Sequence, residues 1–275
     1  MAGDDMSTAP LAARTTAPAP SVRAATAVFV AYAVVVVGLM RLSGVDYDHL
    51  FDTARNTLLG AVLPLAAGAV VLGVVLWRTG WAASGVFRDA TRLGMGFLWS
   101  LPVVMVLTVA LTLASVEWGA FGAGHLLAVL LAALLVGFTE DTLFRGIILR
   151  ALRGALRSEA SAAVLTTAWF GLFHLTNLLL GEPGAVVQVL LAGLTGFGLY
   201  LARRGFGTLV AGMALHAAWD FSTFLSGVHH TDGAAGSAGY FLVVVVYVLA
   251  AASIVVVLVR DRRTPPPIPA ATATA

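Results

Sequence analysis

The sequence predicts an all-α fold: a polytopic membrane bundle of about eight transmembrane helices around a buried polar cavity. Of its 275 residues, 59% are hydrophobic and 11% are charged, and the mean hydropathy is +0.93. These values differ strongly from those of soluble domains. The apolar residues form stretches that reach or approach the ~20 residues needed to span a bilayer, at 24–40, 57–77, 93–114, 124–150, 160–180, 184–202, 208–226 and 239–259.

The arginines support this number of spans and predict that both termini are cytoplasmic. The chain contains no lysine, so arginine alone reports the positive charge that marks cytoplasmic loops. With the N-terminus inside, only Arg41 and Arg55 fall in outer loops, and Arg145 lies within a span. The other arginines fall inside: Arg14, Arg23, Arg78, Arg88, Arg92, Arg150, Arg153, Arg157, Arg203, Arg204, Arg260, Arg262 and Arg263. We therefore expect a multi-pass protein of the plasma membrane that contacts anionic lipid and needs no nucleic-acid partner.

The domain organisation is predicted to be one transmembrane domain, residues 24–260, between two disordered cytoplasmic tails. Residues 1–23 are rich in Ala, Thr and Pro and lack the basic start of a secretory signal. Residues 261–275 are rich in Pro, Ala and Thr and are equally unable to build a core. The absence of cysteine excludes a disulfide framework, a thiol nucleophile and a cysteine metal site.

Two acids and an arginine interrupt the fourth span, and ionisable groups within a span usually mark a functional site. At 3.6 residues per turn, Asp141 and Arg145 share a helix face, whereas Glu140 and Asp141 point about 100° apart. The simplest arrangement pairs Asp141 with Arg145 and leaves Glu140 as the free carboxyl group for chemistry. The alternative is that all three residues form a buried structural network, or an interfacial cluster near a helix end.

Two more spans carry polar residues at helical spacing, Phe170-x-x-x-His174 and His216-x-x-x-Asp220. Counted at ~1.5 Å per residue from the cytoplasmic helix ends, Glu140 lies ~18 Å deep, His174 ~21 Å, His216 ~12 Å and Asp220 ~18 Å. This shared depth on three helices predicts one site. The alternative readings are a lone His174 that hydrogen-bonds between helices and a self-satisfied His216–Asp220 pair. Phe170 is expected to pack under either reading.

Together, Glu140-Asp141-x-x-x-Arg145, Phe170-x-x-x-His174 and His216-x-x-x-Asp220 resemble the motifs of the CPBP (Abi) intramembrane proteases. That family includes the type II CAAX prenyl proteases. The resemblance covers residues 124–226. Asp141 stands where the family usually has Glu, which shortens the arm of the ion pair to Arg145, and Asp220 stands where many prenyl proteases carry Asn.

The resemblance implies hydrolysis of a peptide bond, in a cavity that we expect to open toward the cytoplasm. Glu140 would act as general base on a water also held by His174, and His216 would stabilise the oxyanion. Asp220 would be neutral, orient His216 or bind a cation. Asp141 and Arg145 would support the site.

The cofactor question is open, because Glu140, His174, His216 and Asp220 are all acceptable zinc ligands. A catalytic zinc takes three protein ligands and leaves one position open, so Glu140 would then stay free as the base. The residues slightly favour a scheme without a metal.

The expected partner is a membrane-anchored or membrane-inserted peptide, which would come from the cytoplasmic side or laterally from the bilayer. High Ala and Arg content without Lys indicates a GC-rich bacterial genome, in which peptide maturation, immunity to bacteriocins or protein turnover fits better than cleavage of prenylated proteins. A second hypothesis is a non-catalytic membrane scaffold or a peptide binder of the bacteriocin-immunity type. A third is a proton-coupled transporter, although the sequence lacks the inverted repeats typical of transporters.

Overall fold

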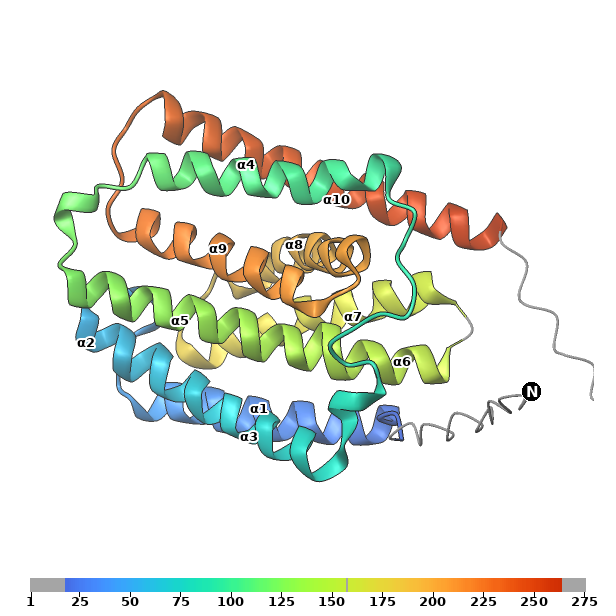
Figure 1. Cartoon of the computed structure of the whole chain (residues 1–275). Coiled ribbons are helices and arrows are strands. Elements are labelled where there is room, and N and C mark those ends of the chain that lie inside the picture. Colours follow the sequence, from blue (N-terminus) through green and yellow to red (C-terminus); the bar gives the residue numbers. More distant parts are fainter. Residues whose placement is uncertain (1–17, 157, 264–275) are drawn as a thin grey trace, which may run out of the picture.

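The computed structural model describes residues 18–156 and 158–263, and these residues form a bundle of helices without a strand (Figure 1). This confirms the predicted all-α class. Most of the two predicted tails, residues 1–17 and 264–275, lies outside the described residues, as do Arg14 and Arg157.

Seven helical segments in the described ranges are long and apolar enough to cross a membrane. Several consist of consecutive elements: α2 (Ala54–Thr57), η2 (Leu58–Val62) and α3 (Leu63–Thr79) are continuous, as are α5 (Ala123–Asp141), η6 (Thr142–Ile148) and α6 (Leu149–Ala155). The 3₁₀ segment η4 (Gly96–Trp99) leads into α4 (Ser100–Ala114), and η7 (His174–Leu180) extends α7 (Glu159–Phe173). The remaining candidates are α1 (Val22–Leu42), α8 (Ala185–Phe206) and α10 (Ala234–Arg263).

Helix α9 (Leu209–Val228) is an eighth long helix, but it is not among the seven apolar candidates. Its 20 residues could span ~30 Å, which is about the thickness of the hydrocarbon core. The helix carries His216 and Asp220, which lower its hydropathy. It packs against α4, α5 and α8 in the interior of the bundle. The polar residues therefore lie on a helix that packs against three others.

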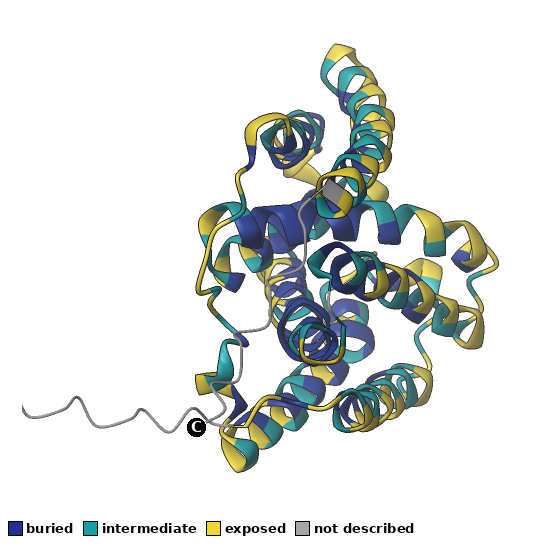
Figure 2. Ribbon diagram, turned by 90° about the vertical axis from the view of Figure 1, so that its right-hand side faces the viewer, coloured by how far each residue is buried: buried dark blue, intermediate teal, exposed yellow. Residues whose placement is uncertain are grey.

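The other helices turn their apolar outer faces away from the core. Figure 2 shows buried positions facing inward and exposed positions facing outward on the peripheral helices. Val34, Val70, Leu127 and Val244 are examples of exposed large hydrophobic side chains on four different helices. Such side chains on a soluble protein would be an aggregation hazard, whereas in a bilayer they contact lipid tails.

A glycine allows α5 and α9 to approach closely beside the predicted site. A Cβ atom at Gly137 would lie 2.6 Å from the carbonyl oxygen of Met213 and 3.1 Å from the backbone nitrogen of Ala217, both on α9. Any larger residue would push the two helices apart. Close contact through glycine is a common way of packing membrane helices, and here it brings Glu140 of α5 near His216 of α9.

Element η6 is a π-helix of seven residues that follows Glu140 and Asp141 directly. All seven residues, Arg145 among them, are buried. Helical spacing in the sequence predicts only an ordinary α-helix here. Segments of π-helix are rare and often occur at functional sites, because the wider turn re-aims side chains.

Candidate functional site

The structure brings the four predicted site residues together. Glu140 near the end of α5, His174 at the start of η7, and His216 and Asp220 on α9 line one cavity of about 150 Å³. His174, His216 and Asp220 also line a second cavity of about 240 Å³, which extends toward α10. We call these the outer lobe and the lateral lobe. His174, His216 and Asp220 line both lobes, whereas Glu140 lines the outer lobe only.

His216 lies at the centre of this group. Its Nε2 atom is 3.5 Å from an oxygen of Asp220 and 3.9 Å from an oxygen of Glu140. Its Nδ1 atom is 3.8 Å from an oxygen of Asp141 and has no hydrogen-bond partner among the described residues. The imidazole is therefore close to three carboxyl groups but forms no hydrogen bond with any of them.

Asp141 and Arg145 form the expected ion pair. Arg145 Nη1 donates to Asp141 Oδ1 at 2.9 Å, and the two side chains are 1% and 0% exposed. The Arg145 guanidinium carbon also lies 3.8 Å from the ring centroid of Phe170. A buried ion pair needs such further contacts to offset the cost of its desolvation. Asp141 in place of the longer Glu of the family motif still reaches Arg145.

The orientation of His174 follows from a single contact. Its Nδ1 atom lies 2.9 Å from the carbonyl oxygen of Phe170. A carbonyl group only accepts, so Nδ1 must carry the proton, and in a neutral ring Nε2 is then the acceptor. The ring of Phe170 packs edge-on against both His174 and His216, with centroids 4.9 Å and 5.8 Å apart. Phe170 therefore contacts Arg145, His174 and His216 and helps to orient them. The sequence predicted only a packing role for this residue.

Three further polar residues of the outer lobe, which form hydrogen bonds with one another, were not predicted from the sequence: Tyr47, Asn177 and Gln188. Asn177 Nδ2 donates to the hydroxyl oxygen of Tyr47 at 3.0 Å and to Oε1 of Gln188 at 2.8 Å. A signal for two of them was present. Gln188 is the only glutamine of the chain, and Asn177 is one of only two asparagines.

A second polar network, also unpredicted, stabilises the end of the bundle nearest to η6. The Asp89 carboxylate accepts hydrogen bonds or ion pairs from Arg153 at 2.7 Å, Arg203 at 2.9 Å and Arg204 at 2.9 Å. Burial alone would raise the pKa of Asp89, but the hydrogen bonds and charges of these arginines hold it well below its ordinary value. Arg203 also donates to the carbonyl oxygen of Arg145, so this network is connected to the π-helix.

The donor groups of the site are not arranged for a metal ion. Within residues 18–156 and 158–263, no three His, Asp or Glu side chains come together in a way that could hold one. The side chains of Glu140, His216 and Asp220 would have to turn toward a common point to ligate zinc. The chemistry of the donors alone remains suitable.

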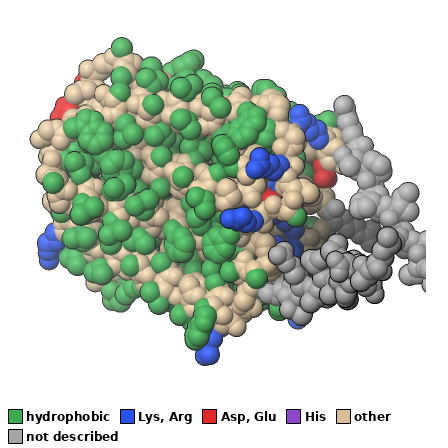
Figure 3. Space-filling view, in the orientation of Figure 1, with side chains coloured by type: hydrophobic (Ala, Val, Ile, Leu, Met, Phe, Trp, Pro, Cys, Tyr) green, Lys and Arg blue, Asp and Glu red, His purple; other side chains and the backbone are tan. Residues whose placement is uncertain are grey.

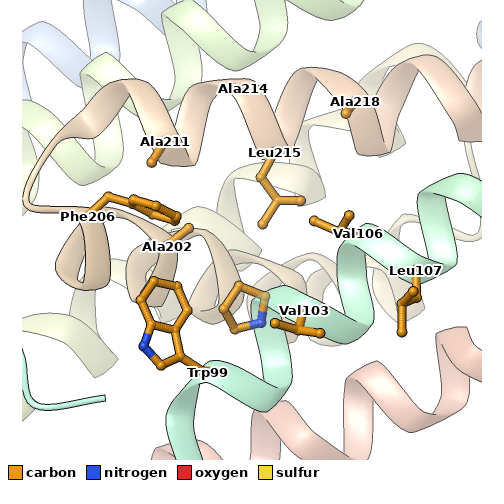
Figure 4. A pocket seen from close by; sticks show the side chains of 11 residues that line it. Trp99, Val103, Val106, Leu107, Ala202, Phe206, Ala211, Ala214, Leu215 and Ala218 are labelled. Carbon is orange, nitrogen blue, oxygen red and sulfur yellow. The ribbon is translucent and has the colours of Figure 1, made fainter. Parts of the chain in front are cut away.

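A larger hollow elsewhere on the bundle is separate from the site. Figure 4 shows this groove of about 520 Å³, which is apolar and faces α4, α8 and α9. Helix α9 contributes Ala214, Leu215 and Ala218 to the groove, whereas His216 and Asp220 line the two lobes on another face. The groove is suited to contact with lipid.

The fold and the site define a class of protein: an integral membrane helical bundle with carboxylate and histidine side chains gathered at a buried cavity. Comparison with known families then agrees with the motifs. Residues 122–222 match the family described as type II CAAX prenyl endopeptidase Rce1-like. The matched segment contains all six predicted site and supporting residues, and it confirms the resemblance to CAAX-type intramembrane proteases. No curated protein and no solved structure matches the chain.

Proposed function

We propose that this protein is an intramembrane endopeptidase that hydrolyses a peptide bond of a membrane-associated protein or peptide. The observation that carries the proposal is the convergence of Glu140, His174, His216 and Asp220, from three helical segments, on one cavity that adjoins a second. An endopeptidase needs room on both sides of the scissile bond, and the two lobes offer it. The match to the CAAX endopeptidase family supports the same reaction.

In this scheme Glu140 is the general base. It takes a proton from water, and the resulting hydroxide attacks the carbonyl carbon of the substrate. Glu140 then returns the proton to the nitrogen of the leaving amine as the C–N bond breaks. The Asp141–Arg145 ion pair leaves the Glu140 carboxyl group without a direct hydrogen bond to either residue.

His174 positions the attacking water. The hydrogen bond from its Nδ1 atom to the Phe170 carbonyl fixes the ring and directs the Nε2 lone pair away from the helix backbone. A water that donates one hydrogen to His174 Nε2 can donate the other to Glu140, which leaves an oxygen lone pair for attack.

His216 stabilises the oxyanion that forms on the substrate carbonyl oxygen. Its Nε2–H would move from its loose contacts with Glu140 and Asp220 to the developing negative charge. Asp220, one helical turn further along α9, orients His216 through the 3.5 Å contact. An ionised Asp220 would oppose the oxyanion, so we assign it this positioning role in its neutral form. Asn at this position could do the same.

Glu140→Gln tests the proposal most directly, because it keeps the size of the side chain and removes the base. We expect purified Glu140→Gln protein to lose cleavage of a fluorogenic membrane-anchored peptide library by at least about 100-fold, the usual contribution of a general base. The matched control is Glu117→Gln at an exposed position of an outer loop, which should retain wild-type activity. Asp220→Asn should retain measurable activity.

The same assay with a chelator separates the remaining alternatives. Loss of cleavage in Glu140→Gln but not with chelator fits the metal-free scheme, and loss in both identifies a metalloprotease. A Glu140→Gln protein that cleaves like the wild type contradicts our assignment of the base. If Glu140→Gln abolishes no cellular function and no cleavage is found, the peptide-binding scaffold is the better description.

A further inference from the structure

The apolar groove between α4, α8 and α9 adjoins a second, more polar hollow. Figure 4 shows Trp99 and Phe206 at one end of the groove, and Leu107 and Ala218 at the other. Phe206 also lines a pocket of about 390 Å³, which is formed by the connection after α3 and the turn between α8 and α9. The Phe206 side chain is therefore shared by the two hollows. Neither hollow is lined by a residue of the candidate site.

The second hollow, which we call the basic pocket, carries two arginines, Arg88 and Arg92. Both are exposed, and within the described part of the chain neither side chain forms a hydrogen bond or an ion pair. Asp89 also lines this pocket, but its side chain is 1% exposed and its charge is bound by three other arginines. The basic pocket therefore presents two positive charges that no acid of the described chain compensates.

Backbone hydrogen bonds fix the position of Arg88. The amide of Asp89 donates to the carbonyl oxygen of Gly207 at 3.1 Å. On the other side of Arg88, the carbonyl oxygen of Phe87 accepts from the amide of Leu209 at 2.9 Å. The connection that carries Arg88 is therefore held against the turn between α8 and α9, and the charge is placed before a ligand arrives.

Arg92 is positioned by packing on a glycine. A Cβ atom at Gly207 would lie 3.4 Å from both Cγ and Nε of Arg92, so a larger residue there would crowd the arginine. The amide of the next residue, Leu93, donates to the carbonyl oxygen of Arg204 at 3.1 Å. Both arginines thus come from a segment whose backbone is bound to α8 and to the turn that follows it.

The groove has nearly the depth of one leaflet of a bilayer. Trp99 and Leu107 are eight residues apart, which corresponds to ~12 Å along a helix, and one leaflet contributes ~15 Å to the hydrocarbon core. Trp99, at the end beside the basic pocket, is of the residue type enriched where the membrane meets water. Its ring packs edge-on against that of Phe206 with centroids 5.1 Å apart, and Gly205 makes room for it.

The size of the groove suits a hydrocarbon chain better than a helix. An α-helix with its side chains is ~10–12 Å in diameter and would need about twice the volume of 520 Å³ over this length. Figure 3 shows how charge is arranged around this region: apolar side chains cover the middle of the face, and basic side chains gather at one end. This is the arrangement of a lipid, whose charged headgroup lies at one end of its chains.

We propose that the basic pocket and the groove together bind one anionic phospholipid, with its phosphate at Arg88 and Arg92 and one acyl chain between α4 and α9. Arginine binds phosphate oxygens through paired hydrogen bonds, and basic pockets between membrane helices are suited to anionic headgroups. Two uncompensated charges favour a headgroup with net negative charge, such as phosphatidylglycerol, over the zwitterionic phosphatidylcholine. This lipid site is independent of the protease function proposed above.

The site has a consequence for α9. Ala214 and Leu215 of this helix line the groove, whereas the next residue, His216, lines both lobes of the candidate site. An acyl chain in the groove would therefore support the face of α9 that lies opposite His216. Because a ligand that binds only the folded state stabilises it, phosphatidylglycerol should raise the thermal midpoint of unfolding in detergent.

The headgroup site is tested by titrating the purified protein, in a neutral detergent, with phosphatidylglycerol and counting bound lipid by native mass spectrometry. The wild type should bind one phosphatidylglycerol per chain, at least about 10-fold more tightly than phosphatidylcholine with the same acyl chains. The double variant Arg88→Gln/Arg92→Gln should bind phosphatidylglycerol about 30-fold more weakly, roughly fivefold for each arginine, and should no longer distinguish the two lipids.

The matched control is Arg23→Gln/Arg78→Gln, which removes two other exposed arginines that line neither hollow. It should bind phosphatidylglycerol like the wild type. Equal losses in the two double variants would show an effect of net charge alone and would overturn the proposal. So would a wild type that binds both lipids with the same affinity, because the groove would then hold lipid without recognising its headgroup.

The groove is tested with Ala214→Phe, which fills it from an exposed position of α9. This variant should bind phosphatidylglycerol at least about 10-fold more weakly, because the acyl chain loses its packing contacts. Val210→Phe is the control, since Val210 is 61% exposed on the same helix but does not line the groove. Equal affinity of the two phenylalanine variants would show that the chain lies elsewhere.

A competition experiment separates a lipid from a free phosphate ligand. Glycerol 3-phosphate carries the phosphate but no acyl chain, so a 100-fold excess should leave phosphatidylglycerol bound. Displacement by glycerol 3-phosphate would show that the basic pocket takes the phosphate group alone, and the lipid site would be wrong.

Discussion

Asp141 and Arg145 form an ion pair whose side chains are almost completely buried. One oxygen of Asp141 and one nitrogen of Arg145 have no hydrogen-bond partner among the described residues, so the pair is only partly compensated. The main role of the ion pair is therefore to position side chains of the site. It holds Arg145 against Phe170, which in turn packs on both histidines of the site.

Removing the charge of Asp141 should destabilise the fold strongly. Asp141→Asn leaves the Arg145 guanidinium buried beside a neutral group, and breaking a buried pair in this way costs about 3–5 kcal/mol. We expect a clear fall in the thermal midpoint of unfolding in detergent. Asp141→Glu is the control, because it keeps the charge and corresponds to the usual acid of the family motif. If the Asn variant were as stable as the Glu variant, the ion pair would contribute nothing.

At the scale of elements, the contact between α5 and α9 sets the distance between Glu140 and His216. These two helices are in extensive contact. Gly137 makes the approach possible about one turn before Glu140. The π-helix η6 then redirects the chain so that Arg145 faces Asp141 and the ring of Phe170.

Gly137→Ala should therefore damage both stability and the site. Its Cβ atom would overlap the α9 backbone, and overpacking of this kind costs about 1–3 kcal/mol. A displacement of about 1 Å between catalytic groups can lower activity ~100-fold. We expect a lower thermal midpoint and reduced cleavage.

Gly124→Ala is the matched control on the same helix, because a Cβ atom there meets nothing within 4 Å. This variant should be active and equally or slightly more stable, since alanine favours helix over glycine by about 1 kcal/mol. Equal behaviour of the two alanine variants would show that the close approach of α5 and α9 is dispensable.

At the scale of the whole molecule, one end of the bundle is stabilised by ion pairs between segments far apart in the sequence. Asp89 in the connection after α3 binds Arg153 of α6 as well as Arg203 and Arg204 of α8. This carboxylate therefore links a loop to two helices, and Arg203 extends the network to the backbone of η6. The pKa of Asp89 is lowered in the folded state relative to the value of about 3.9 in an unfolded chain.

The lowered pKa predicts a loss of stability in acid. A group of this kind contributes its full stabilisation above the unfolded pKa, near pH 4, and loses it as the pH falls through the lower folded pKa. The Asp89→Asn variant lacks this stabilising contribution of the ionised carboxylate at every pH. We expect its thermal midpoint to lie well below that of the wild type at pH 7, and the difference to shrink as the pH falls below about 4.

Asp48→Asn provides the comparison, because Asp48 is exposed in the short 3₁₀ segment η1 (Tyr47–His49). Its thermal midpoint should follow that of the wild type at every pH. A difference between Asp89→Asn and wild type that stays constant down to pH 2 would contradict the linkage to the Asp89 carboxylate.

The membrane class and the candidate residues were accessible from the sequence for the same physical reason. A bilayer requires long apolar stretches and penalises ionisable groups, so Glu140, His174, His216 and Asp220 were conspicuous against their surroundings. Helical spacing alone was enough to pair Asp141 with Arg145, and the structure contains that pair. The polar residues Asn177 and Gln188 of the outer lobe were also indicated by the rarity of asparagine and glutamine in the chain.

What only the tertiary structure decided is how the helices are rotated and arranged around one another. Tyr47 and Asn177 are 130 positions apart and yet share a hydrogen bond, and Asp89 meets Arg203 across 114 positions. The hydropathy of a segment indicates that it lies in lipid, but it does not indicate which face of the helix packs against its neighbours. The packing of α9 against three helices and the π-helix beside Glu140 depend on that arrangement. The sequence by itself therefore determined which groups are present in the membrane, and packing decided where they meet.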